Sequence, residues 1–388
     1  MYDDVSSSHD SSRPFGTHPA SFITLPLKSG ATYNFLVRWG DGTSHTITSY
    51  NQADITHEYD RDGIYTVVIT GQIDAWGFVD NGYYGDAVKL IEIRQWGSLK
   101  LNTGGQWFEG CRSLSLISAT DTPDHSEVTD YKYAFQYTNL STVDFTDWDV
   151  SPATSFLNMF YSVPHFQGDL STWDVSKGED FEQMFRKSAA FTGAGLSGWD
   201  TSSATSLSDM FSHGTNFNED ISGWDVSSVT KMTRMFRWHL FFDQDLSGWD
   251  TSSVTECIGM FSYTEKFNAN IGDWDTSSVT SFEGMFQGAA AFDHDLSRWS
   301  TSAMTECVDF GNPGCNPAEM VLEDCVELNH YTCPLERQPT YLDRYCNPHH
   351  AACEDLPEYN GTGHCQLKLG VCAALLNNPK EELPCIIP

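Results

Sequence analysis

Residues 217–236 read Phe-Asn-Glu-Asp-Ile-Ser-Gly-Trp-Asp-Val-Ser-Ser-Val-Thr-Lys-Met-Thr-Arg-Met-Phe, and near-copies of this stretch recur through the middle of the chain. A fixed period of this length is typical of stacked repeats, in which each repeat buries its apolar face on its neighbours. The pattern excludes an ordinary globular enzyme core for this part of the chain. Steps of 25 residues, with one step of 26, separate Trp148, Trp173, Trp199, Trp224, Trp249, Trp274 and Trp299.

Positions within a repeat are numbered here from its tryptophan. Apolar residues stand at −3, +5, +8, +11 and +12, and the spacing after the tryptophan follows the period of a helix. Serine occupies +3 in every repeat, which suits a helix N-cap. We therefore expect a short strand, a tight corner and a short helix in each repeat. The extra residue of the single 26-residue step falls beside Gly193 and Gly195, where a glycine bulge can absorb it.

These units resemble the BspA-like leucine-rich surface-protein repeat. The resemblance covers about residues 88–310 and rests on six near-copies of the repeat. It implies an LRR-like solenoid without catalytic activity, in a cell-surface or secreted adhesion or interaction protein.

Residues 22–75 follow a different pattern of alternating strands and turns. The turn Trp39-Gly-Asp-Gly-Thr43 is followed by His57-Glu-Tyr59 and by Gly63-Ile-Tyr-Thr-Val67. This order resembles a PKD-type immunoglobulin-like β-sandwich, which implies an extracellular spacer or binding domain. We expect Asp41 to accept backbone N–H bonds in an Asx-turn, and a metal ligand is the alternative.

The predicted organisation has four parts: a polar N-terminal tail (1–21), a PKD-like β-sandwich (22–75), a BspA-like LRR solenoid (76–310) and a Cys-rich C-terminal cap (311–388). The predicted fold class is therefore a repeat solenoid, LRR-like, with one short strand plus a short helix in each 25-residue coil. A small β-sandwich precedes it and a disulfide-rich tail follows it.

Eleven cysteines divide into two groups. Cys257 and Cys307 occupy the apolar +8 position and Cys111 lies in a similar apolar stretch, so we expect these three to be buried thiols. The other eight lack the C-x-x-C spacing of zinc sites, and we expect four disulfides that cap the end of the solenoid. These eight are Cys315, Cys325, Cys333, Cys346, Cys353, Cys365, Cys372 and Cys385.

The formal charge of −32 comes from 53 acidic and 21 basic residues. Such a field repels nucleic acid and anionic membranes, and favours cations or basic partners. No apolar run approaches the roughly 18 residues of a transmembrane helix. The first thirteen residues lack the apolar core of a secretory signal. Since the tail is of the disulfide type, we interpret this as an incomplete N-terminus and predict an extracellular or cell-surface location.

Aspartate recurs at two positions of the repeat and so forms two acidic columns along the stack. Stacking brings like charges together, which destabilises unless something offsets it. Either each carboxylate accepts backbone N–H bonds at a corner, the interpretation we favour, or Ca²⁺ bridges neighbouring coils. The column at −4 holds Asp144, Asp169, Asp220, Asp245 and Asp295, with Asn270 in one repeat. The column at +1, the candidate Ca²⁺ ligands, holds Asp149, Asp174, Asp200, Asp225, Asp250 and Asp275.

No nucleophile elbow, P-loop, H-E-x-x-H or dinucleotide fingerprint occurs in the sequence. We therefore predict a non-catalytic surface or secreted protein that presents a solenoid face to a protein or glycan ligand. It would bind no nucleic acid and, Ca²⁺ apart, no cofactor. A structural or Ca²⁺-dependent extracellular scaffold is the alternative, and an accessory region of an extracellular hydrolase is a remote one. The sequons at Asn139 and Asn360 permit glycosylation if the chain is secreted.

Overall fold

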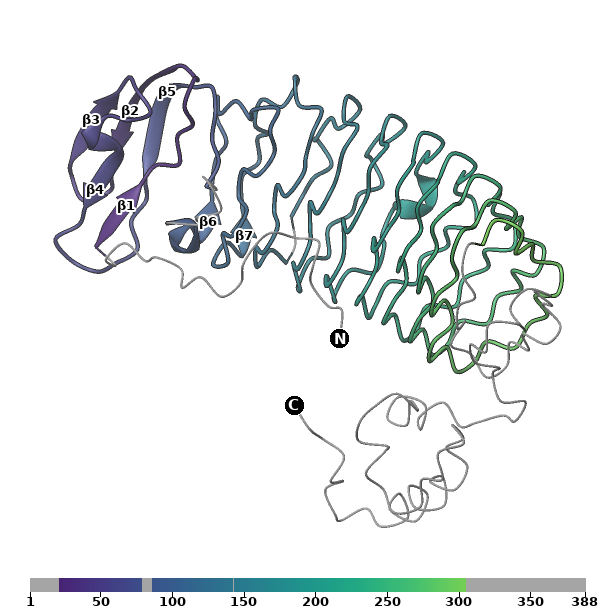
Figure 1. The fold of residues 1–388 in the computed structure, drawn as a ribbon. Helices are drawn as coiled ribbons and strands as arrows, with labels where there is room; N and C mark the ends of the chain where they lie inside the picture. Colours follow the sequence, from purple (N-terminus) through teal and green to yellow (C-terminus); the bar gives the residue numbers. More distant parts are fainter. Residues whose placement is uncertain (1–20, 79–85, 142, 305–388) are drawn as a thin grey trace, which may run out of the picture.

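The computed structural model describes residues 21–78, 86–141 and 143–304, and a curved stack of loops extends from a group of short strands at one end (Figure 1). The helical elements of these residues are 3₁₀ turns: η1 (Ala53–Ile55), η2 (Ala87–Lys89) and η3 (Leu196–Gly198). The strands are β1 (Phe22–Thr24), β2 (Tyr33–Arg38), β3 (Ser44–Ile47), β4 (Thr56–Glu58), β5 (Val68–Ile73), β6 (Glu92–Ile93) and β7 (Leu116–Ile117).

The first five strands form two small open sheets. Strands β1 and β4 pair antiparallel, and the second sheet has the order β3-β2-β5, also antiparallel. Side chains alternate along β2, so that Tyr33, Phe35 and Val37 are buried while their neighbours face outward. Together with Trp39 and Ile47 they form one hydrophobic cluster shared by both sheets.

The Trp-Gly-Asp-Gly turn is held by Asp41. Its Oδ1 accepts bonds from the backbone N–H of Thr43 at 2.8 Å and from the Thr43 hydroxyl at 2.6 Å, which confirms the predicted Asx-turn. These bonds lower the pKa of Asp41. The sequence did not indicate that His57 Nε2 would lie 2.7 Å from Asp41 Oδ2, or that its ring would stack on Trp39 at 4.7 Å.

The second sheet continues into the stack of repeats. Ile73, at the end of β5, pairs in parallel with Leu99, and Lys100 donates its N–H to the Ile73 carbonyl at 3.1 Å. Strands β6 and β7 then pair in parallel. Further along, single parallel bridges join each repeat to the next in register: Asp130–Ser155, Ser155–Asp180, Asp180–Ser206, Ser206–Lys231, Lys231–Glu256 and Glu256–Ser281.

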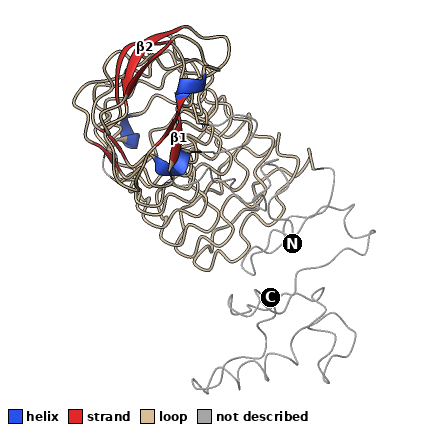
Figure 2. Ribbon diagram, turned by 90° about the vertical axis from the view of Figure 1, so that its left-hand side faces the viewer, coloured by secondary structure: helices blue, strands red, loops and turns tan. Residues whose placement is uncertain are grey.

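The predicted fold class of one strand plus one helix per coil is wrong. No α-helix occurs in residues 21–78, 86–141 or 143–304, the sheets are few, small and open, and the repeats are drawn almost wholly as loop (Figure 2). The serine column therefore caps no helix. The backbone reason lies at +10 and +14, where φ is positive and a right-handed helix cannot continue. In one repeat these residues are Gln183 (φ 57°) and Lys187 (φ 62°).

Two successive turns replace the expected helix. Met184 donates its N–H to the Phe181 carbonyl at 3.2 Å, and Ser188 donates its N–H to the Phe185 carbonyl at 3.0 Å. A left-handed residue in the third position of such turns is the geometry of a type II turn. Because these turns also bring residues three and four apart onto one side, their apolar spacing imitates that of a helix.

The remaining N–H groups of this segment bond to the next repeat. Those at +8, +10, +12 and +14 each donate to the carbonyl of the preceding position in the following repeat, so every second N–H joins two repeats. Phe185 donates to Met210 at 3.0 Å, and Lys187 donates to Ser212 at 2.9 Å. Backbone polar groups that water cannot reach are thereby satisfied without a helix or a continuous sheet.

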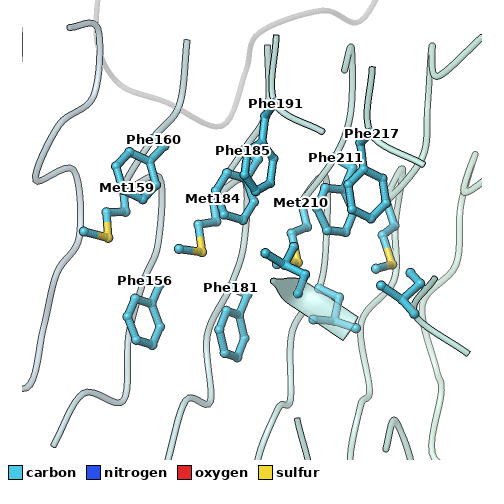
Figure 3. Close-up of a cluster of buried hydrophobic side chains, with 14 of the residues drawn as sticks. Phe156, Met159, Phe160, Phe181, Met184, Phe185, Phe191, Met210, Phe211 and Phe217 are labelled. Atoms are coloured by element: carbon cyan, nitrogen blue, oxygen red, sulfur yellow. The ribbon is translucent and has the colours of Figure 1, made fainter. Parts of the chain in front are cut away.

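Aromatic rings fill the interior of the stack (Figure 3). In each repeat the phenylalanine at +12 stacks on the one that closes the repeat, as Phe185 does on Phe191 at 4.1 Å. The Phe185 ring also stacks on Phe160 at 5.8 Å and on Phe211 at 5.9 Å in the flanking repeats. Such ring pairs add to the apolar area that each repeat buries on its neighbours.

The recurring tryptophan has a polar role as well as an apolar one. Its indole N–H donates to the carbonyl of the −3 residue in the preceding repeat, at distances between 2.8 and 3.2 Å from Trp173 to Trp299. A buried indole needs such a partner. Phenylalanine could fill the space but could not make this bond between repeats.

Local features at glycine and cysteine can be compared with the predictions within the described residues. Gly193 and Gly195 have φ of 93° and 89°, and Gly195 directly precedes the 3₁₀ turn η3, so a turn stands where a β-bulge was predicted. Cys111 and Cys257 are buried free thiols, as predicted, and burial raises the pKa of both. Cys307 and the eight tail cysteines lie outside the described residues, so the predicted cap and its disulfides stay predictions.

Candidate functional site

The candidate Ca²⁺ ligands lie at exposed corners of the stack. In each of the six, Oδ1 accepts the backbone N–H of the serine two residues later, at 2.9 to 3.1 Å. Carboxylates of the −4 column do the same: Asp220 Oδ1, for example, accepts the backbone N–H of Ser222 at 2.9 Å. These bonds are the corner capping that we favoured from the sequence.

Serine also lowers the pKa of several of these carboxylates. The hydroxyl and the N–H of Ser227 lower the pKa of Asp225, and Ser277 does the same for Asp275. These two aspartates are therefore held as anions that already have a donor. Within the residues that the structure describes, no group of three or more His, Cys, Asp or Glu side chains is arranged to hold a metal ion.

A shallow acidic depression lies along the −4 column. It has a volume of about 460 Å³ and is lined by Asp243, Asp245, Ser247, Asn270 and others. Its carboxylates are again used by the backbone, since Asp245 accepts from Ser247 at 2.9 Å and Asp243 accepts from Asn268 at 3.0 Å. The depression is thus built from corner caps.

Asp225→Asn tests capping against calcium bridging. Asparagine keeps the acceptor for the Ser227 N–H and removes a charge, so we expect an unchanged or slightly higher melting temperature, while Asp225→Ala as the control should melt lower. If Ca²⁺ bridged the repeats, it would add about 2.7 kcal/mol of stability at a hundredfold excess over Kd. A melting shift specific to calcium, lost in Asp225→Asn, would show that capping is not the whole role of this column.

A second lane along the stack carries no acidic residue at all. Positions +13 and +14 are neighbours across repeats, because the +14 N–H donates to the +13 carbonyl of the next repeat, as from His213 to Arg237 at 2.7 Å. We call these fourteen residues of seven repeats the acid-free strip. They are Gln136, Tyr137, Tyr161, Ser162, Arg186, Lys187, Ser212, His213, Arg237, Trp238, Ser262, Tyr263, Gln287 and Gly288.

Aromatic and cationic side chains contact one another along this strip. Lys187 Nζ lies 5.7 Å from the centre of the Tyr161 ring. The Trp238 ring stacks on Tyr263 at 4.0 Å and lies 6.3 Å from His213. The absence of a side chain at Gly288 leaves room for the Tyr263 ring, since a Cβ at this position would come within 2.6 Å of that ring.

An ion-pair network borders the strip on its inner side. Asp209 is buried between Arg186 and Arg234, whose Nε atoms lie 3.6 and 3.2 Å from its two oxygens. Within the described residues, Asp209 Oδ1 and both Nε atoms make no hydrogen bond. On the adjacent +7 and +9 columns, burial raises the pKa of Asp180 and of Glu182.

Sequence reasoning missed the acid-free strip. The signal was present, since aligning the repeats shows two adjacent columns without Asp or Glu in a chain that has 53 of them. Of the two predicted sequons, Asn139 is half-buried and donates its backbone N–H to the Leu114 carbonyl at 3.0 Å. Asn360 lies outside the described residues.

Comparison with known proteins gives one family. The family described as "Mycoplasma protein of unknown function, DUF285" matches residues 102–221, 179–257 and 240–310, which together span more than half of the chain. No curated protein matches the chain. No solved structure matches it either. The BspA-like and PKD-like resemblances therefore stay predictions.

Proposed function

Since the chain belongs to the DUF285 family, whose description assigns no function, we propose a function from the surface of its repeats: a non-catalytic protein that presents one face of the stack to a protein or glycan ligand. The observation that carries this proposal is the acid-free strip. Ten of its fourteen residues are partly or fully exposed, and none of the ten is a carboxylate in a chain of charge −32, whereas Gln136, Tyr161, Ser212 and Ser262 are buried. Depletion of Asp and Glu with enrichment of Tyr, Trp and Arg is the composition of binding surfaces.

The interior of the stack supports a surface role. Aromatic rings and methionines fill it, and the cavity among Met232, Cys257, Met260 and Phe282 holds about 10 Å³, about the room of one water molecule. A ligand would therefore meet the repeats from outside. Half-buried rings such as Trp238 and Tyr263, and the exposed side chain of Phe241 three residues after Trp238, are available there.

We propose an extracellular or cell-surface location. Its support is the Cys-rich composition of residues 311–388, which is typical of secreted chains. None of the helices in the described part of the chain is long and apolar enough to cross a membrane. The alternative function is a structural or Ca²⁺-dependent scaffold, which the acidic corners would favour if they bound calcium between chains.

A binding array separates these functions. The intact chain is applied to immobilised glycans and extracellular proteins, once with calcium and once with EDTA. The proposed function predicts specific binding in both conditions, because the acid-free strip contains no metal-ligating carboxylate. Binding that requires calcium would favour the scaffold, and absence of binding in both conditions would contradict the proposal.

A further inference from the structure

We infer that the acid-free strip binds a linear anionic polysaccharide, laid along the stack so that its carboxylate or sulfate groups meet the strip's cations and hydrogen-bond donors. The inference rests on the proposed function and names the partner class for the same surface. The strip carries Arg186, Lys187, His213 and Arg237 and no residue of opposite charge. Arginine and lysine are the side chains that bind carboxylate and sulfate groups.

The charges nearest the strip determine whether a polyanion is attracted there, although the whole chain is acidic. At physiological ionic strength the screening length is about 8 Å, so exposed carboxylates farther away contribute little at the strip. The −4 and +1 columns are acidic in nearly every repeat, so they repel a polyanion from the corners of the stack.

The shape of the strip favours a linear polymer over a globular protein. Seven repeats at about 4.8 Å each make a lane of roughly 30 Å in length. The lane is narrow, because Gln136, Tyr161, Ser212 and Ser262 of its +13 column are buried. A stable interface between globular proteins buries about 800 Å² on each partner. A globular acidic partner of that size would also cover the flanking aspartates, where like charges repel.

The spacing of the strip favours a sugar chain over an extended peptide. Neighbouring repeats follow one another at about 4.8 Å along the strip. Side chains on one face of an extended peptide recur every two residues, about 6.7 Å, which falls out of register within a few repeats. The length of one pyranose unit is close to the spacing of the strip.

The arginines at the inner border provide directed donors. Asp209 forms ion pairs with the guanidinium groups of both Arg186 and Arg234. Each guanidinium has five N–H donors in a fixed fork. Arg186 uses one of them on the Gln183 side-chain oxygen at 3.1 Å. The side chain of Arg234 is about one-third exposed, and its Nε is buried beside Asp209.

The test measures binding of the full chain to immobilised polygalacturonate and dextran sulfate, with uncharged dextran as the control ligand. The double variant Lys187→Glu/Arg237→Glu reverses two strip cations. The matched variant Lys266→Glu/Arg298→Glu makes the same change in net charge at exposed cations away from the strip. We expect the chain to bind at least one polyanion and not dextran. Binding should fall at least about tenfold in the strip variant and less than about threefold in the matched variant.

Thermal melting of both variants shows that they are folded before binding is compared, and Trp238→Ala serves as a third variant that keeps the charge. An equal loss in the two charge variants would overturn the inference, because it would reflect net charge alone. So would binding of dextran as tight as that of the polyanions. If the array finds a ligand and neither polyanion binds or competes for it, the inference fails while the proposed function stands. If nothing binds in either experiment, both fail.

Discussion

Replacing Phe185 by alanine is expected to lower the free energy of unfolding by about 3–5 kcal/mol, the range for removing a fully buried phenylalanine. The side chain is 1% exposed and its ring stacks on four others, in its own repeat and in both flanking repeats. The stack cannot close the resulting cavity without shifting two interfaces. Since stability in a repeat protein is a sum of repeat and interface contributions, the loss weakens both junctions of one repeat.

Chemical unfolding followed by tryptophan fluorescence measures this effect. The matched control is Phe241→Ala, which removes the same side chain from a position that is 57% exposed. We expect that control to change stability by less than about 0.5 kcal/mol. Similar losses for both variants would mean that the ring ladder does not hold the repeats together.

Protonation of His239 is expected to destabilise the stack as the pH falls. The imidazole is fully buried, makes no hydrogen bond in the described structure, and contacts the edges of Phe217 and Phe242 at 5.9 Å. Burial lowers its pKa from 6.5 to about 4. The unfolded chain therefore takes up the proton first. The contribution of the neutral ring is fully present above pH 6.5 and is lost as the pH falls from 6.5 to about 4, by about 3 kcal/mol in all.

His239→Thr is the control for this pH dependence. In the same column Ser188 and Thr264 donate their hydroxyls to the Phe160 and Phe236 carbonyls at 2.6 and 3.1 Å. Threonine at 239 can make the corresponding bond and does not titrate. Between pH 6.5 and pH 4 the protein with His239 should lose unfolding free energy relative to the His239→Thr variant. Denaturation of both proteins at each pH measures this change. A constant difference over this range would contradict a neutral buried histidine.

The sequence alone was enough to predict the period, the buried columns and the stacking. Trp224 and Phe236 are buried where the repeat pattern placed them, and the corner aspartates accept the expected N–H bonds. The helix could not be rejected from the pattern, because turns and helices share the spacing of three and four. The left-handed +10 position is occupied by Gln183 and Arg234 in two repeats, and these residue types do not indicate a positive φ.

Two glycines carry the signal that could have corrected the helix prediction. Gly259 and Gly284 stand at +10 in the last two complete repeats, with φ of 59° and 60°. Glycine in the middle of a helix costs about 1 kcal/mol relative to alanine, so its presence in two successive repeats argues against a helix. The acid-free strip depends on this geometry, since the same two turns bring +13 and +14 of successive repeats together.

Gly284→Ala tests the turn-based stack most directly, because the two structures predict opposite signs. A Cβ at this position meets no atom closer than 3.7 Å, so the effect comes from the backbone alone. With φ at 60°, alanine is strained, and we expect the melting temperature to fall by an amount equivalent to about 1 kcal/mol. In a helix the same substitution would stabilise by about 1 kcal/mol. A lower melting temperature for Gly284→Ala is the result that this structure predicts, and a higher one would contradict it.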